Sequence, residues 1–397
     1  MKRGNGYKEI ECIGYDGYYY IYANGICFDS KRNILLIPEE EIPSKNQNKN
    51  ENTISKNIIQ ASGLNNYGNS CFINALLQCL INCEPLTNYF LTNYKKTNFN
   101  NLSNIYQDFI KKYQQKDFNA AKGIVNYFFN RDSSIKKEGS DSKDVLIEFF
   151  DQIQSELKQA DESLTIETST NPENEKQVIE ERIMLDNADF SIINKCFNFW
   201  LENEQKCYNR NCPKYYKSLY EIRSESYFVF YLNEIYNYTN NLSRKKNGYN
   251  YKIPLENCFY YNLIEKGICS YCQQKIEIKN KICKLPNILV IVLNRGKNNQ
   301  YNLNIDFNHE LNLDKYYQQL RYKINGQNQE VFPKYNLLCG TILEKDYHNP
   351  GRGHTFAFAT DKNGKYTIYN DNKIIFNVGF DYIKNKDVYI LFYEIKK

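Results

Sequence analysis

Histidine is scarce in this sequence, which has only three, His309, His348 and His354, among its 397 residues. Histidine exchanges protons readily near neutral pH, so any reaction that needs such a base must use one of these three. We expect His309 to be a surface or edge residue, because no pattern around it suggests a partner. His348 lies in a loop rich in glycine and proline, whereas His354 leaves that loop and enters an alternating strand. The end of a strand suits a catalytic base, which favours His354.

Long apolar runs are absent as well. The longest, from Ile288 to Leu293, is far too short to cross a bilayer and instead predicts a central strand buried on both faces. The first residues lack the apolar core of a signal peptide. The net charge of +5 is small for this length and no block of like charges stands out. We expect no membrane insertion, no nucleic-acid partner and a monomer.

Cysteine, by contrast, is abundant. The chain has 13 cysteines, and an odd number without a secretion signal indicates reduced thiols, a metal site or a catalytic thiol. A cytoplasmic or nuclear location follows as an expectation. With 42% hydrophobic and 24% charged residues, the composition is that of a soluble globular protein.

One cysteine, Cys71, lies where a turn meets a helix. The seven residues from Gly63 to Asn69 include two glycines and three asparagines, and the residues after Cys71 are apolar at helical spacing. Asn69 and Ser70 are good N-cap residues. The free N–H groups at a helix start favour a thiolate, so Cys71 suits a nucleophile. A small buried residue in a capped helix explains the same pattern equally well.

The stretch from Gly63 to Leu80 also resembles the cysteine box of ubiquitin-specific proteases. The matching residues are Gly63, Leu64, Asn66, Gly68, Asn69, Cys71, Asn74, Leu76, Leu77 and Gln78. Ser70 replaces the usual threonine and Phe72 the usual tyrosine. The resemblance implies a papain-like α+β fold with a helical thumb, a β palm and β fingers. It also implies hydrolysis of isopeptide or peptide bonds after the C-terminal glycine of ubiquitin.

A second match follows some 280 residues later, around His354. The strand that begins there is followed by a turn and a second strand, Tyr366–Tyr369, which predicts a hairpin that returns Asn370 and Asp371 towards His354. This order resembles the family's histidine box, although Thr355 replaces the usual aromatic residue. The motifs span roughly residues 61 to 395 in family order.

The resemblance implies a role for each site residue. Cys71 is the nucleophile and His354 its base. Asn370 accepts the His354 ring N–H, and Asp371 shares or takes over that role. Asn66 donates from its amide to the tetrahedral oxyanion, beside a backbone N–H near Cys71. From the residues alone, Asn66 is equally an Asx-turn residue.

Two acids are candidates for substrate binding. The stretch from Ser140 to Ile153 is apolar at helical spacing and resembles the family's second box, without its leading glutamine. Asp141 and Asp144 stand at the acidic positions, which in the family face the basic tail of ubiquitin. An N-capped amphipathic helix explains both acids equally well.

Four cysteines form two pairs, Cys207-x4-Cys212 and Cys269-x2-Cys272. Four thiolates brought together by two loops would bind zinc tetrahedrally, although the first pair has a looser spacing than usual. The family carries two such pairs at the tips of its β fingers. The alternative is four ordinary reduced cysteines. Catalysis itself needs no cofactor.

The chain divides along its length as follows. Residues 1–43 are predicted to form a few strands of unassigned role, and residues 44–60 a polar linker. Residues 61–397 then form the catalytic domain. Within it we expect an acidic insertion loop at residues 158–185 and the fingers at residues 200–285.

Three functions are compatible with these motifs. The first is an active deubiquitinase, whose partners are ubiquitin and ubiquitinated proteins. The second is a protease for another ubiquitin-like modifier, because the glycine tails of these modifiers are alike. The third is a ubiquitin-binding pseudoenzyme, which normally lacks the catalytic cysteine or histidine; both are present here.

Overall fold

The computed structural model describes four short strands between residues 10 and 35 and, further along, residues 60–97, 101–138, 141–157, 191–216, 218–236, 252–295, 303–318, 333–345, 353–361 and 364–396. The predicted insertion at 158–185, the predicted linker at 44–60 except its last residue, and His348 lie outside these residues. The chain forms two compact units. The first comprises Met1–Lys56, Asp161–Ala188 and Gln318–Phe332, and the second comprises Asn57–Ala160, Asp189–Tyr317 and Pro333–Lys397.

The described part of the first unit is an antiparallel sheet in the order β1-β2-β3-β4. Its strands are β1 (Ile10–Ile13), β2 (Tyr19–Ala23), β3 (Ile26–Phe28) and β4 (Ile34–Leu35). The strands expected within residues 1–43 are therefore present.

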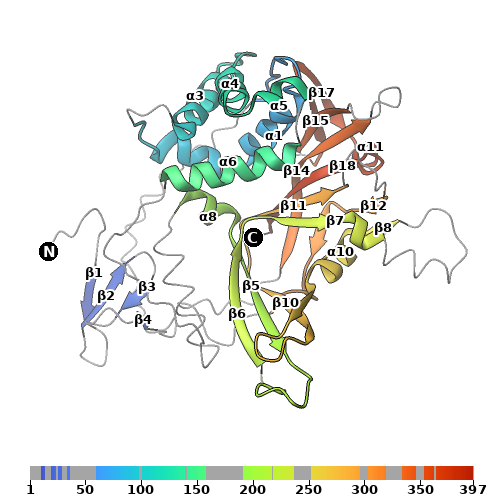
Figure 1. Cartoon of the computed structure of the whole chain (residues 1–397). Coiled ribbons are helices and arrows are strands. Elements are labelled where there is room, and N and C mark those ends of the chain that lie inside the picture. Colours follow the sequence, from blue (N-terminus) through green and yellow to red (C-terminus); the bar gives the residue numbers. More distant parts are fainter. Residues whose placement is uncertain are drawn as a thin grey trace, which may run out of the picture. The chain divides into compact units, whose positions relative to one another are not determined.

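The second unit begins with a group of helices, drawn in cyan to green in Figure 1. They are α1 (Cys71–Asn82), α2 (Glu84–Asn88), η2 (Tyr89–Asn93), α3 (Leu102–Gln114), α4 (Lys122–Arg131), α5 (Ser133–Glu138), α6 (Ser142–Leu157) and α8 (Ile192–Phe197). The amide of Asn101 caps α3, and the Glu156 carboxylate of α6 accepts the N–H groups of Leu102 and Ser103 at 2.9 and 2.7 Å. This anion at the start of α3 holds the two helices together.

A large sheet follows, in the order β17-β16-β15-β14-β18-β11-β7, with β13 paired to β14. Its strands are β7 (Phe228–Tyr231), β11 (Ile288–Asn294), β13 (Glu310–Asn312), β14 (Lys334–Lys345), β15 (Gly353–Thr360), β16 (Tyr366–Asn370), β17 (Lys373–Val378) and β18 (Val388–Ile395). Only the pair of β11 and β7 is parallel; the other pairs are antiparallel. The hairpin predicted after His354 is formed by β15 and β16.

Strand β11 shows how this sheet is buried. Its alternate residues Ile288, Val290 and Val292 belong to the core shared with the helices, and Leu289, Ile291 and Leu293 belong to the core on the opposite face. The second core also takes in β8 (Ile253–Pro254), α10 (Leu255–Asn262), β12 (Ile305–Asp306) and α11 (Phe380–Lys384). Burial on both faces was predicted correctly. The predicted interior position is also confirmed, because β11 pairs with β18 on one side and with β7 on the other.

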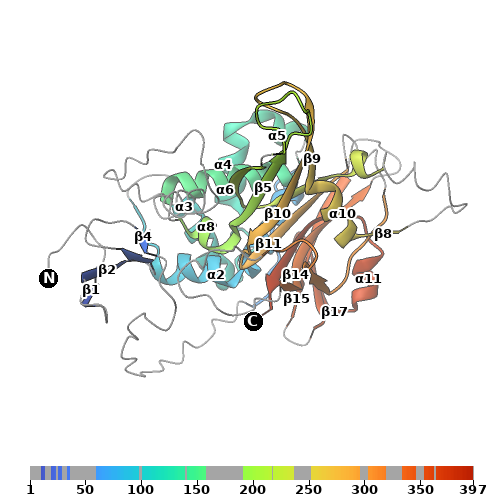
Figure 2. The same cartoon turned by 90° about the horizontal axis from the view of Figure 1, so that it is seen from below.

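A separate sheet in the order β6-β5-β10-β9 extends away from the helices, as Figures 1 and 2 show. Its strands are β5 (Phe199–Lys206), β6 (Ser218–Glu225), β9 (Ile264–Ile268) and β10 (Lys275–Lys284). The helical, palm-like and finger-like parts expected from the sequence are all present. Among the described residues, no helix has the length and apolar character needed to span a membrane.

Candidate active site

Helix α1 begins at Cys71, after a tight turn. Gly68 and Asn69 both adopt left-handed backbone conformations, with φ of 75° and 51°, which glycine and asparagine tolerate best. Ser70 occupies the N-cap position, as predicted, but its side chain does not cap the helix. The Ser70 hydroxyl instead accepts the N–H of Tyr67 at 2.9 Å. The N–H groups of the first turn therefore have no side-chain cap and can serve a developing anion.

His354, the second residue of β15, lies between Cys71 and Asn370. The Cys71 side chain is close enough to raise the pKa of its ring, and its Nε2 is 2.6 Å from Oδ1 of Asn370, the last residue of β16. An amide oxygen only accepts, so Nε2 carries the hydrogen and Nδ1 is left to take the thiol proton. The structure thus brings together three residues that are far apart in the sequence.

These contacts also shift the protonation of His354. Hydrogen bonding to Cys71 raises the pKa of His354 from 6.5 to about 9, partial burial acts against this, and the Asn370 hydrogen bond adds to it. Since the folded-state pKa is the higher one, the protonated ring stabilises the fold fully below about pH 6.5. This contribution is lost as the pH rises through about 9.

Asp371 differs from its predicted role. Its carboxylate accepts the side-chain amides of Asn66 at 2.9 Å and Asn74 at 2.8 Å. Its backbone oxygen accepts the N–H of Leu64 at 2.9 Å. Asn370, not Asp371, bonds to the His354 ring. Asp371 therefore fastens the cysteine loop to the histidine hairpin.

The side chain of Asn66 is exposed and has a fixed orientation. Its Oδ1 accepts both the N–H and the hydroxyl of Ser70, each at 3.2 Å. A backbone N–H can only donate, so the amide oxygen must face Ser70 and the amide nitrogen must face Asp371. One Nδ2 hydrogen goes to Asp371, and the other has no partner among the described residues. The turn and oxyanion interpretations of Asn66 are therefore compatible.

Buried contacts behind the site were not anticipated from the sequence. The Tyr113 hydroxyl donates to Oε1 of Gln78 at 2.7 Å, and Gln78 donates to the backbone oxygen of Ser62 at 2.8 Å. Ser62 in turn donates its N–H to the Tyr113 hydroxyl at 3.1 Å. Next to it, a side chain at Gly63 would lie 2.7 Å from the backbone of Asn372. Gln78 and Gly63 matched the cysteine box, but Tyr113 carried no signal.

Asp141 is largely buried and caps α6. Its carboxylate accepts the N–H of Lys143 at 2.8 Å and the hydroxyl of Tyr389, and burial raises the pKa of the Asp141 carboxyl. The capping alternative for Asp141 is therefore realised. Asp144 pairs with Lys143 at 2.8 Å, but its side chain is exposed. The Asp144 carboxylate is therefore still accessible to a partner. The Ser142 hydroxyl donates to the backbone oxygen of Phe72 at 3.3 Å, which sets this end of α6 beside the start of α1.

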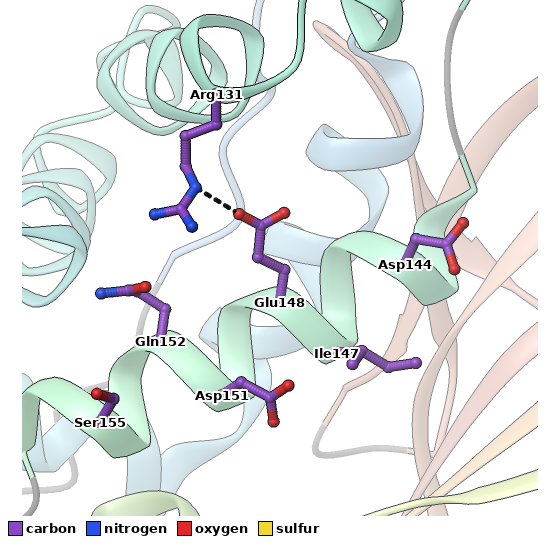
Figure 3. A pocket seen from close by; sticks show the side chains of 7 residues that line it. All are labelled: Arg131, Asp144, Ile147, Glu148, Asp151, Gln152 and Ser155. Atoms are coloured by element: carbon purple, nitrogen blue, oxygen red, sulfur yellow. Dashed lines mark ion pairs between the residues drawn. The ribbon is translucent and has the colours of Figure 1, made fainter.

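A pocket runs along the outer face of α6 (Figure 3). Asp144, Glu148 and Asp151 line it from α6, and Arg131 of α4 pairs with Glu148 at 2.8 Å. The remaining lining residues are Ile147, Gln152 and Ser155. Three acids against one arginine make this pocket acidic, and the Asp144 end lies towards Cys71.

The two cysteine pairs meet at the end of the finger sheet. The Sγ atoms of Cys207, Cys212, Cys269 and Cys272 all lie within 4.8 Å of one another. Two of the separations are 3.5 and 3.8 Å, and a metal bound to four thiolates at about 2.3 Å sets its sulfur atoms about 3.8 Å apart. A backbone hydrogen bond from Gln274 lowers the pKa of the Cys272 thiol to about 6. This cluster can hold a metal ion.

His309, the other histidine in the described residues, is not part of this site. Its Nδ1 is 2.8 Å from the Tyr366 hydroxyl, and its ring also contacts Phe380. It is partly buried and packs against the hairpin rather than lying fully on the surface.

A family model described as ubiquitin carboxyl-terminal hydrolase matches residues 62–393. "Ubiquitin carboxyl-terminal hydrolase 15" of Homo sapiens is 42% identical over 55 residues, which is 13% of this chain and 6% of that protein. "Probable ubiquitin carboxyl-terminal hydrolase 1" of Schizosaccharomyces pombe is 42% identical over 66 residues, or 16% of this chain and 8% of that protein. The aligned stretches span less than a tenth of these relatives.

Solved structures give a match over nearly the whole chain. A chain of the SAGA DUB module Ubp8/Sgf11/Sus1/Sgf73 bound to monoubiquitin aligns with a TM-score of 0.59 and 17% identity, covering 95% of this chain and 81% of that one. The same module bound to ubiquitin aldehyde gives a TM-score of 0.58 with the same identity and coverage. These likenesses concern the fold, and they confirm the expected α+β class with thumb, palm and fingers.

The raised pKa of His354 can be measured by NMR titration of its ring, assigned with a His354→Gln variant. We expect a pKa of about 9 in the wild type. In Cys71→Ala it should fall towards 6.5, because the largest cause of the shift is removed, and in Asn370→Ala it should fall less. Equal values in the wild type and Cys71→Ala would contradict the pairing of His354 with Cys71.

Proposed function

Because the chain belongs to the ubiquitin carboxyl-terminal hydrolase family, we propose that it is a cysteine-dependent deubiquitinase. It would hydrolyse the isopeptide or peptide bond after the C-terminal glycine of ubiquitin and so free ubiquitin from protein conjugates. The observation that carries this proposal is the chain of contacts from Cys71 through His354 to Asn370. The resemblance noted in the sequence is confirmed by the family match.

In the proposed reaction, Nδ1 of His354 takes the proton of the Cys71 thiol before the sulfur attacks the carbonyl carbon, a transfer that the raised pKa of the ring favours. The same ring then donates this proton to the leaving amine. Asn370 holds the ring in the required tautomer without adding a charge. Water completes the cycle by hydrolysing the thioester, with His354 as its base.

The tetrahedral oxyanion would be bound at the start of α1. The proposed donors are the uncapped N–H groups of the first turn and the second amide hydrogen of Asn66, which lies on the turn that leads into Cys71. Removing one such donor typically slows a reaction by about 10²–10³-fold. Asp371 acts through Asn66, since it fixes the amide nitrogen in place.

The acidic pocket along α6 would bind a substrate whose residues before the scissile bond are positively charged. We assign Asp144 to this contact, joined by Glu148 and Asp151 along the same face. Asp141 contributes by shaping the start of α6, since its carboxylate is occupied by Lys143 and Tyr389. The fold match to a chain solved with monoubiquitin is compatible with ubiquitin as the partner.

A fluorogenic substrate on the ubiquitin C-terminus tests this function directly. The wild type should release the fluorophore, and Cys71→Ser should lose at least about 10³-fold in kcat/KM because the nucleophile is gone. Asn370→Ala should keep partial activity, since it removes only the orienting bond.

The same assay with other ubiquitin-like modifiers separates the first two candidate functions. If the fluorophore is released faster from another modifier than from ubiquitin, that modifier is the substrate instead of ubiquitin. If no modifier is turned over and no C-terminal electrophile is captured by Cys71, the chain is a binding protein rather than an enzyme.

We also propose that the four-cysteine cluster holds a structural zinc ion. When bound, zinc would cross-link the two loops at the end of the finger sheet and take no part in hydrolysis. The sulfur separations suit it. Burial raises the pKa of the Cys212 thiol, and the backbone N–H of Lys214, which donates to its Sγ at 3.4 Å, acts against this. The looser Cys207–Cys212 spacing does not prevent the four sulfurs from meeting.

The zinc assignment predicts about one zinc per purified chain and close to none in Cys212→Ser, with a lower melting temperature. A matched control is Cys258→Ala, a buried cysteine outside the cluster, which should keep its zinc. Metal-free wild-type protein, or an unchanged zinc content in Cys212→Ser, would contradict the assignment. The measurement is elemental analysis alongside thermal unfolding.

Further proposals follow from the sequence expectations. Residues 61–397 form the catalytic domain, residues 1–43 a separate β-rich segment joined to it by residues 44–60, residues 158–185 an insertion and residues 200–285 the fingers. The chain acts as a monomer in the cytoplasm or nucleus, on ubiquitinated proteins rather than on nucleic acid or within a membrane.

A further inference from the structure

Exposed aromatic side chains gather at the end of the finger sheet that carries the cysteine cluster. The finger tip comprises residues 207–216 and 266–275, which are the two loops there and the adjoining ends of β9 and β10. They contain five of the twelve large hydrophobic side chains that are exposed in the described residues: Tyr208 (59%), Tyr215 (37%), Tyr216 (63%), Ile268 (62%) and Tyr271 (40%). Clusters of this kind mark interaction surfaces, whereas single exposed apolar residues are common.

These side chains touch one another. The ring of Tyr216 packs edge to face against Tyr208 and Tyr215, with centroids 5.4 and 5.1 Å apart. The Nζ of Lys214 is 5.2 Å from the ring centroid of Tyr271, which links the two loops. The aromatic side chains therefore form a connected surface rather than scattered exposures.

Tyr216 also carries backbone strain. Its φ is 61°, a left-handed conformation that suits glycine or asparagine and is unusual for a bulky residue. Its N–H closes the first loop onto the oxygen of Cys207 at 2.9 Å, as the N–H of Gln273 closes the second onto Cys269 at 2.9 Å. The loop needs this conformation, but it does not need a tyrosine. Since the ring is mostly exposed, its burial within the fold repays little of the strain.

The finger tip carries basic side chains without acidic ones. Its residues include Arg210, Lys214, Lys266 and Lys275 and no acidic residue. A partner with acidic side chains would therefore be attracted to this surface.

We propose that the finger tip docks an acidic protein segment, in which aspartate and glutamate flank an apolar or aromatic side chain. Tyrosine and arginine on a rigid support are the residues that contribute most to protein interfaces. Nucleic acid fits less well, because base stacking needs free ring faces. Here the tyrosines pack against one another and Lys214 covers Tyr271.

Such docking would not compete with catalysis. The finger tip lies at the end of the second unit remote from α1, where Cys71 begins the catalytic helix (Figure 1). A partner bound there would bring the enzyme to a target while leaving Cys71 and the α6 pocket open.

The experiment selects binders to the whole 397-residue chain from a displayed library of random twelve-residue peptides. The test variant combines Tyr216→Gly, which removes the ring and relieves the strain, with Arg210→Glu. The matched control combines Tyr260→Gly with Lys252→Glu, two exposed residues outside the finger tip. Zinc content and release of a ubiquitin-linked fluorophore are measured for all three proteins and should be unchanged.

We expect the selected peptides to be rich in aspartate and glutamate around an apolar residue. The wild type and the control should bind them equally, the test variant at least about tenfold more weakly, with binding weakened by salt. Failure to select acidic peptides, or equal binding by the test variant, would overturn the proposal. Tighter binding of a twenty-nucleotide oligouridine than of the peptides would overturn it in favour of nucleic acid.

Discussion

The proposed catalytic arrangement depends on the contacts of Asp371 with the turn before Cys71. Its carboxylate accepts Asn66 and Asn74, and its backbone oxygen accepts Leu64, so one residue at the end of the histidine hairpin fixes a segment some 300 residues earlier. The φ of Asp371 is 50°, which places side chain and backbone oxygen for these contacts. A charged acceptor shared between two amides gives strong, directional bonds. The hydrogen bonds from Ser70 hold the oxygen of the Asn66 amide, and Asp371 holds its nitrogen, so both ends of this amide are fixed.

The hydrogen bonds of Asp371 with Leu64, Asn66 and Asn74 are called the Asp371 clamp, and the start of α1 lies next to it in the sequence. Ser70 occupies the N-cap position, yet its hydroxyl serves the turn, which leaves the helix N–H groups uncapped beside Cys71. An uncapped helix start normally costs about 1 kcal/mol of stability. In the proposed mechanism the same groups bind the oxyanion, so a local cost to the fold would become an advantage in the transition state. The pKa of His354 is raised for a separate reason: the effect of Cys71 outweighs the effect of partial burial.

The sequence was sufficient to predict most helices and strands and to predict that Cys71, His354 and Asn370 lie together. Turn residues and strand alternation around these three residues are local signals. It was not sufficient for side-chain partners that come from distant strands. Asp141 was a candidate for substrate contact, but Tyr389, 248 residues later, occupies its carboxylate. Likewise, the apolar composition of β11 predicts that the strand is buried. It does not predict which strands lie beside β11, because strand order depends on the topology of the sheet. The true partners of Asp371 were hidden for the same reason.

The most direct test of this account is a double-mutant cycle on kcat/KM for a fluorogenic ubiquitin substrate, with Asn66→Ala and Asp371→Asn singly and combined. Asparagine at position 371 tolerates the left-handed backbone but offers one acceptor in place of two and no charge. If Asp371 acts through Asn66, the combined loss should be far smaller than the product of the single losses. Losses that multiply would show that Asp371 acts independently of Asn66, and would contradict the clamp as the basis of the site.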